Sequence, residues 1–125
     1  MQSRVAIVGA GLAGLTAARR LAEAGCDVVV FEKSRGLGGR LATRRTDFGP
    51  IDHGAPGVPS ELGLALGGVF WPDGRDNGRG VGVPGMSALA RALATGIDVR
   101  HGVTVAALTD LPDGWRLTDA DGLDC

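Results

Sequence analysis

The chain has 125 residues, of which 44% are hydrophobic and 22% are charged, and its formal net charge is −1. This length and composition predict one soluble globular domain, or part of one, that can bury a core. A charge so near zero gives no general attraction to nucleic acid or to an anionic membrane. The two cysteines, Cys26 and Cys125, make no disulfide framework and no metal-ligand cluster, so we expect a reducing, cytoplasmic environment.

A strand, a helix and a second strand are predicted at the start of the chain. Residues 5–8 form a short apolar run, residues 12–24 predict an amphipathic helix, and Gly25 ends that helix. Residues 28–31 then predict a second apolar strand, which completes one βαβ-type unit. The apolar face of the helix consists of Leu15, Ala18, Leu21 and Ala22.

A secretory signal is the alternative interpretation of this N-terminal apolar run, because Arg4 precedes residues 5–18. The run is too short to span a membrane. Arg19 and Arg20, which follow it, fit a helix surface better than a cleavage region. We therefore predict neither a signal sequence nor a membrane anchor.

The link between the first strand and the helix is a GxGxxG sequence at residues 9–14, the first glycine turn. Gly9 permits a tight turn, Gly11 leaves room for a pyrophosphate, and Gly14 lets the helix pack closely on the strand. This pattern in this context predicts a dinucleotide-binding site. The alternative is a glycine-rich turn that binds nothing.

Two further features support a dinucleotide. Leu12 and Ala13 begin the helix, whose first N–H groups are unpaired and carry the positive end of the helix dipole, which attracts phosphate. Glu32 ends the second strand, 23 residues after Gly9, near the spacing of a carboxylate that accepts hydrogen bonds from a ribose.

Gly38, Gly39 and Arg40 form a second glycine turn, which is predicted to open a short helix. Arg44 and Arg45 follow it. Backbone N–H groups and a guanidinium fork at such a turn can bind a phosphate. A solvated basic loop is the alternative, but the position directly after the ribose-binding strand favours the ligand side of the sheet.

The remaining elements are less regular. Glycine and proline dominate residues 54–84, which predict mainly loops. Asp110, Asp113, Asp119 and Asp121 are interpreted as turn residues and His101 as a structural residue. Trp71 and Trp115 are predicted to pack in a core or in the hairpin. The predicted elements are a strand at 48–51, a helix at 86–94, a third parallel strand at 97–100, a hairpin from 103–108 and 114–118, and a further strand after the turn at 119–122.

The order of these motifs resembles renalase-like flavoproteins, within the amine-oxidase and glutathione-reductase type. The specific stretches are DHGA at residues 52–55 and GVPGMSALARALA at residues 82–94. The resemblance covers most of the chain and is weakest at residues 56–80. It implies an α/β fold: a Rossmann-like FAD/NAD(P)-binding domain with a parallel sheet and a layer of β-hairpins.

The resemblance implies FAD as the cofactor and an oxidase that takes a hydride from a dihydronicotinamide-type or amine substrate and passes electrons to oxygen. It places the first glycine turn at the pyrophosphate and Glu32 at the ribose, with Val105 facing the adenine through its backbone. His53 is as well explained as a generic loop histidine. The implied cofactor-binding residues are Gly9, Gly11, Leu12, Ala13, Gly14, Glu32, Lys33, Gly39, Arg40, Asp52, His53, Gly54, Ala55 and Val105.

The chain stops before the last sheet strand and the second cofactor-binding segment of that family. We therefore expect residues 1–125 to be an incomplete dinucleotide-binding domain without a substrate domain, and an exposed sheet edge to favour self-association. Three functions compete. They are a flavoprotein oxidoreductase or its FAD-binding part, an NAD(P)-dependent dehydrogenase, which the second glycine turn argues against, and a non-catalytic nucleotide-binding module or truncated gene product.

Overall fold

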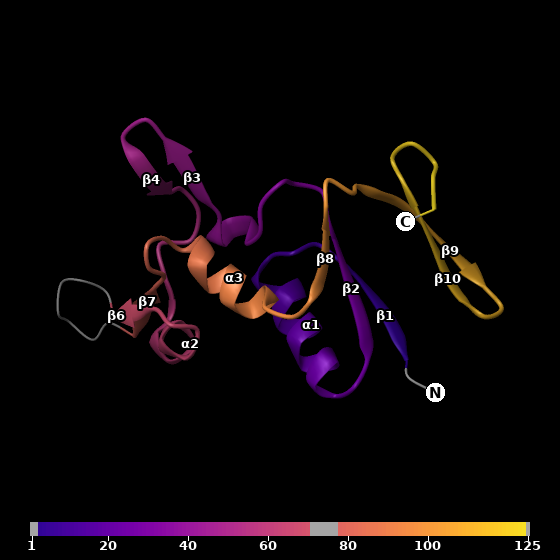
Figure 1. Cartoon of the computed structure of the whole chain (residues 1–125), viewed down its shortest axis with the longest axis horizontal. Coiled ribbons are helices and arrows are strands. Elements are labelled where there is room, and N and C mark those ends of the chain that lie inside the picture. Colours follow the sequence, from indigo (N-terminus) through magenta and orange to yellow (C-terminus); the bar gives the residue numbers. More distant parts are fainter. Residues whose placement is uncertain (1–2, 71–77, 125) are drawn as a thin grey trace.

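The computed structural model describes residues 3–70 and 78–124, and its centre is a parallel β-sheet (Figure 1). The strands are β1 (Arg4–Val8), β2 (Asp27–Glu32) and β8 (Asp98–His101), in the spatial order β1-β2-β8. Ile7 lies opposite Val30, which in turn lies opposite Val99, so β-branched side chains form a row across the sheet. The three predicted parallel strands are confirmed.

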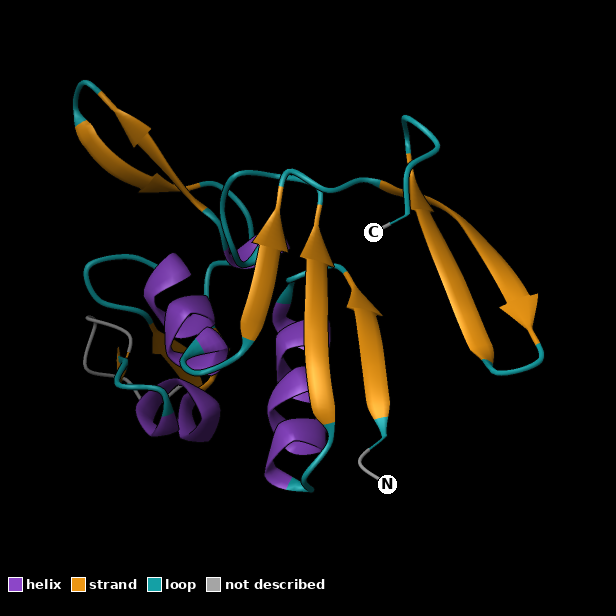
Figure 2. Cartoon of the chain, turned by 45° about the vertical axis from the view of Figure 1, so that its right-hand side comes forward, coloured by secondary structure: helices purple, strands orange, loops and turns teal. Residues whose placement is uncertain are grey.

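Two helices, α1 (Leu12–Glu23) and α3 (Ser87–Ala94), share one hydrophobic core with the sheet. Figure 2 shows α1 running behind the strands. Leu15, Ala18 and Ala90 are fully buried in this core. The small alanine side chains let the helices approach closely, and a buried leucine contributes about 1.5–3 kcal/mol. The helices predicted at 12–24 and 86–94 are confirmed, with ends shifted by one residue.

Between β2 and α3 the chain leaves the sheet and forms short elements. The predicted strand at 48–51 is β4, but its partner β3 was not predicted. Strands β5, β7 and β6 form a small antiparallel sheet. We call the segment between β2 and α3, residues 33–86, the excursion. A second core cluster, formed by Leu41, Val58, Met86 and Leu89, packs this segment against α3. The elements are η1 (Gly39–Leu41), β3 (Thr43–Thr46), β4 (Gly49–Asp52), β5 (Val58–Pro59), α2 (Ser60–Ala65), β6 (Val69–Phe70) and β7 (Arg79–Val81).

The predicted C-terminal hairpin consists of β9 (Val105–Leu111) and β10 (Gly114–Asp119). It lies at the opposite end of the molecule from the hairpin β3–β4 (Figure 1). The further strand expected after residue 122 is reduced to one bridge between Thr118 and Asp124. Asp119 acts as a turn residue, as predicted, because its carboxylate accepts the N–H groups of Asp121 and Leu123, both at 2.9 Å.

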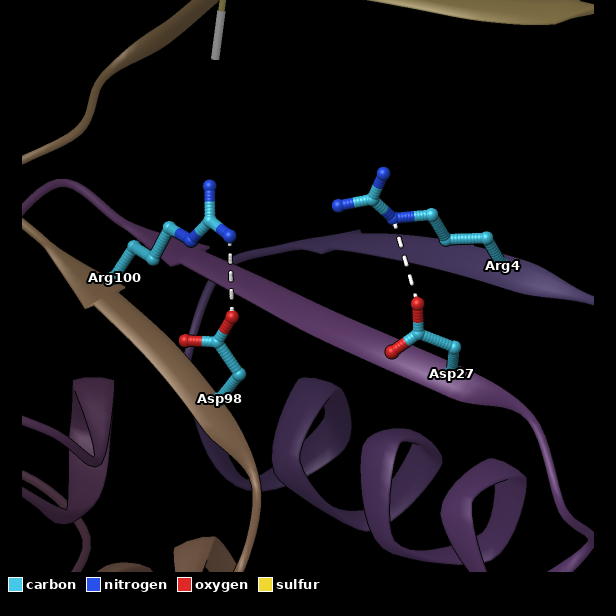
Figure 3. Close-up of polar contacts among 4 residues, drawn as sticks. All are labelled: Arg4, Asp27, Asp98 and Arg100. Carbon is cyan, nitrogen blue, oxygen red and sulfur yellow. Dashed lines mark hydrogen bonds and ion pairs between the residues drawn. The ribbon is translucent and has the colours of Figure 1, made fainter.

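The outer face of the sheet faces this hairpin and carries charged pairs at its margins. Arg4 Nε lies 3.5 Å from Asp27 Oδ2, and Arg100 Nη2 lies 3.2 Å from Asp98 Oδ2; Figure 3 draws both ion pairs. Both pairs are exposed, so each contributes about 0–1 kcal/mol. The strand β1 is an edge of the sheet, and self-association through it stays a prediction.

Trp115 was predicted to pack either in a core or in the hairpin. It lies in β10, is 65% exposed and lines the cleft between the hairpin and the outer sheet face, so the core alternative is excluded. The hairpin has only two paired strands and cannot enclose a side chain of that size. Trp71 lies outside the described residues. In those residues, no helix is long and apolar enough to cross a membrane.

Candidate functional site

The first glycine turn connects the carboxyl end of β1 to the start of α1 and is fixed to the neighbouring strand. Gly9 adopts φ of 101°, a conformation that favours glycine, and its N–H donates to the Phe31 carbonyl at 2.8 Å. Leu15 N–H donates to the Gly11 carbonyl at 2.9 Å, which is the first bond of the helix ladder. The N–H groups of Leu12 and Ala13 precede that bond and project from the helix end.

The N-terminal end of α1 has no capping group of its own. Gly11 is the N-cap in an extended conformation, no side chain caps the helix, and no acidic residue lies in its first turn. The positive end of the helix dipole therefore meets solvent at the turn, which is an arrangement that binds anions.

The glycines of this turn differ in what surrounds them. A Cβ on Gly14 would lie 2.0 Å from the Gly9 carbonyl oxygen, so close packing of helix on turn demands glycine there. A Cβ on Gly11 would have its nearest heavy atom, the Gly38 carbonyl oxygen, at 4.0 Å. The protein itself leaves space at Gly11, beside the uncapped helix end. This space is what a bound pyrophosphate requires, so the residues present fit the predicted dinucleotide.

Glu32 is buried at the end of β2 and is 7% exposed. Its Oε2 accepts the Ala10 N–H at 2.7 Å, and its Oε1 accepts the Ser34 N–H and the Ser34 hydroxyl, both at 2.8 Å. A carboxylate offers about four acceptor positions, so a ribose hydroxyl can still be accommodated. The sequence analysis did not predict this second role of Glu32, which is to link the first glycine turn to the loop after β2 by hydrogen bonds. Ser34, two residues after Glu32, was the sequence feature that could have indicated it.

The charge of Glu32 is stabilised by this environment. Burial alone would raise the pKa of Glu32, but the hydrogen bonds from Ser34 N–H, Ala10 N–H and the Ser34 hydroxyl outweigh it, with help from the charge of Lys33. The pKa of Glu32 therefore lies below its ordinary value of 4.5. The site therefore holds an ionised carboxylate, which accepts hydrogen bonds.

The second glycine turn packs directly on the first. The Gly38 N–H donates to the Ala10 carbonyl at 2.8 Å, and Gly11 and Gly38 form a parallel bridge. Gly38 and Gly39 have φ of 108° and 54°. The short helix predicted to follow is the single turn η1. The Arg40 side chain is exposed, and the part of the chain that the structure describes shows no hydrogen bond or ion pair to it.

The DHGA stretch meets the second glycine turn through backbone contacts. The Ala55 N–H donates to the Arg40 carbonyl at 2.7 Å, and a Cβ on Gly54 would lie 2.0 Å from that carbonyl oxygen. The structure thus brings the predicted residues Arg40, Gly54 and Ala55 together. His53 is exposed.

Asp52 holds the start of α3. Its carboxylate accepts the Met86 N–H at 3.1 and 3.2 Å and the Thr43 hydroxyl at 2.5 Å. Thr43 Oγ1 also accepts the Ser87 N–H at 3.1 Å. The predicted role of Asp52 near a flavin stays a prediction, and no local sequence pattern indicates this contact with the helix.

Val105 begins β9, two residues after Val103, whose N–H donates to the Glu32 carbonyl at 3.1 Å. The Gly102 N–H donates to the Ser34 carbonyl at 3.3 Å. The chain therefore passes beside the carboxyl end of β2 just before the predicted adenine-facing residue.

Comparisons with known proteins agree with this geometry. Residues 7–61 match the family model of an NAD(P)-binding Rossmann-like domain. The chain is 47% identical over 51 residues to a hydroxyneurosporene desaturase of Cereibacter sphaeroides, which covers 41% of this chain and 10% of that protein. It is 54% identical over 69 residues to a zeta-carotene-forming phytoene desaturase of Myxococcus xanthus, which covers 51% of this chain and 13% of that protein.

Solved structures show the same fold at low sequence identity. A redesigned putrescine oxidase superposes with a TM-score of 0.75 and 15% identity over 99% of this chain and 56% of that chain. A Diels-Alderase of pyrroindomycin biosynthesis superposes with a TM-score of 0.60 and 19% sequence identity, over 99% of this chain and 30% of that chain.

The chain spans about a tenth of the length of the curated relatives it matches. Its Rossmann-like dinucleotide-binding fold is confirmed, and the curated relatives are named as desaturases. The narrower resemblance to renalase-like proteins stays a prediction.

Proposed function

We propose that this chain is the FAD-binding part of a flavoprotein oxidoreductase. The observation that carries the proposal is the open space at Gly11 beside the uncapped start of α1. The fold would tolerate a Cβ at this position, so the fold alone does not explain the glycine. A bound pyrophosphate does explain it, because it needs this space and the N–H groups around it.

In this proposal different residues bind different parts of the cofactor. The N–H groups of Leu12 and Ala13 hold the pyrophosphate, and the Glu32 carboxylate accepts a hydrogen bond from the adenosine ribose. The exposed Arg40 guanidinium binds a phosphate with its fork of donors. The backbone near Val105 faces the adenine, and residues 52–55 lie toward the flavin.

FAD, when bound, supplies the ring that accepts a hydride. The chain binds the ADP half, orients it through the two glycine turns, and keeps Glu32 ionised. The proposed substrates are dihydronicotinamide-type or amine compounds, on the resemblance to renalase-like flavoproteins. The desaturase relatives support oxidation as the reaction class.

The test is a calorimetric titration of the purified chain with FAD, ADP, NAD and NADP, with an absorption spectrum of the flavin complex after gel filtration. We expect FAD and ADP to bind with similar affinity, because the contacts lie on the ADP half, and NADP to bind more weakly than NAD. FAD binding with no binding of ADP would contradict the assignment of the glycine turns. NAD binding without FAD binding would instead support an NAD(P)-dependent dehydrogenase.

The substitution Glu32→Ala measures in the same titration how much the Glu32 carboxylate contributes to ligand binding. Losing a hydrogen bond to a charged group costs roughly 1.5–3 kcal/mol, so FAD and NAD affinity should fall about ten- to a hundredfold. The preference for NAD over NADP should disappear with the charge. Unchanged affinity for FAD and NAD would remove Glu32 from the ribose site.

A further inference from the structure

A second cleft, of about 1070 Å³, lies between the hairpin β3–β4 and the beginning of α3. This volume is ample for a small molecule. The lining comes from four separate parts of the chain. They are the loop at 35–37, residues 42–50 of the hairpin segment, residues 84–91 at the start of α3, and His101 at the end of β8.

The charged residues that line this cleft are all basic. Arg35, Arg45 and Arg91 line it together with His101, and no aspartate or glutamate does. The chain as a whole has a net charge of −1, so this is a local excess of positive charge. Such an excess in a concave site attracts anions.

The guanidinium groups are available to a ligand. In the described part of the chain, Arg35 and Arg45 take part in no ion pair. Arg91 donates one hydrogen bond, from Nη1 to the Ser87 hydroxyl at 3.0 Å, and keeps its other donors. The Asp52 carboxylate near Thr43 is already engaged by the Met86 N–H and the Thr43 hydroxyl.

The cleft is distinct from the dinucleotide site. Residues 9–14 and Glu32 do not line it. Thr43 and Arg45 lie on the same face of β3, because alternate residues of a strand point to the same side. The Thr43 hydroxyl already donates to Asp52 and accepts the Ser87 N–H, so the hairpin offers the cleft the Arg45 guanidinium.

We propose that this cleft binds a second anionic ligand, a small molecule that carries a diphosphate or triphosphate group. Three guanidinium groups from three different elements match a ligand with several charged oxygens, which accept paired N–H bonds. The proposal does not depend on FAD as the dinucleotide, because it rests on a separate set of residues.

The probe is inorganic pyrophosphate, titrated calorimetrically into the full chain. We expect Arg45→Gln and Arg91→Gln each to weaken binding about tenfold or more, as for loss of a charge-assisted hydrogen bond. The matched control is Arg20→Gln, which removes the same charge from an exposed position on α1 and should change the affinity less than twofold. Circular dichroism checks the fold, and Arg45→Gln, in an exposed hairpin, carries the test if Arg91→Gln unfolds.

Gly11→Val provides the second control, since it fills the dinucleotide site. Pyrophosphate affinity should survive this substitution. Three results would overturn the proposal: no binding to the parent chain, equal weakening by Arg20→Gln, or loss of binding in Gly11→Val, which would place the pyrophosphate on the first glycine turn.

Discussion

The two glycine turns lie against each other, yet their glycines are required for different reasons. In the second turn, Gly38 and Gly39 have positive φ angles, and a Cβ on Gly38 would lie 3.2–3.3 Å from Leu41, Ala42 and Ala90. In the first turn, the fold requires Gly9 for its φ angle and Gly14 for its packing. Gly11 alone of these five has an ordinary φ and free space.

A glycine required for folding can thus be distinguished from a glycine required for binding. A glycine that the backbone conformation or packing demands reports on the fold. A glycine that neither backbone conformation nor packing requires, and that lies at the uncapped end of a helix, indicates a ligand-binding position.

Gly14→Ala should have the largest effect, and it should act on folding. Its Cβ would lie 2.0 Å from the Gly9 carbonyl oxygen, so the helix or the turn must move. We expect a loss of about 3 kcal/mol or more in the free energy of unfolding, measured by urea denaturation. Gly36→Ala, where a Cβ meets nothing within 4 Å, is the control and should change stability by about 0.5 kcal/mol or less. Equal midpoints for the two variants would contradict the packing argument.

Gly11→Val should leave folding intact and remove binding. The extended backbone of Gly11 suits valine, and the nearest heavy atom to its Cβ is 4.0 Å away. We expect the affinity for ADP and FAD to fall about a hundredfold or more, or roughly 2.7 kcal/mol, with little change in Tm. A Tm that falls as far as in Gly14→Ala would show that the space at Gly11 belongs to the fold.

Glu32→Gln tests the link between the first glycine turn and Ser34. The amide keeps the size of the side chain but turns one acceptor into a donor, opposite donors on Ala10 and Ser34. We expect a loss of about 1–3 kcal/mol in stability at neutral pH. Because the folded-state pKa is lowered, the parent chain's advantage is fully present above about pH 4.5 and is lost as the pH falls through the folded-state value. Urea denaturation at several pH values measures this, and a pH-independent difference would refute it.

Arg40→Lys should have the smallest effect. Lysine keeps the charge but loses the fork of donors, so we expect FAD affinity to fall about five- to tenfold and to become more sensitive to salt. Arg20→Lys, on the exposed surface of α1, should bind FAD as the parent does. If both variants bind equally well, the second glycine turn serves only as a turn.

The sequence predicted the sheet, both long helices and the C-terminal hairpin because those elements carry periodic apolar patterns and clear end signals. In the excursion between β2 and α3 it predicted β4 and the short helix η1, but it missed β5 and β6, which have two residues each and show no alternation. Proline occurs in β5, which further weakens its strand signal. The pairing of these two strands depends on distant partners, such as Val58 with Gly80.

The candidate site divides in the same way. The glycines and Glu32 follow from a local motif of about thirty residues. The bond from Ala10 to Glu32 spans 22 residues and that from Met86 to Asp52 spans 34, so both depend on the folded geometry.

The bond between Asp52 and Met86 also has a consequence for how the molecule can be altered. It joins the two ends of the segment formed by residues 53–85, which carries β5, α2, β6 and β7. With its ends held, doubling the length of a loop costs only about 0.6 kcal/mol in chain entropy. A foreign segment can therefore be inserted at the exposed turn at Gly67 to add a new binding specificity, while the first glycine turn keeps its structure.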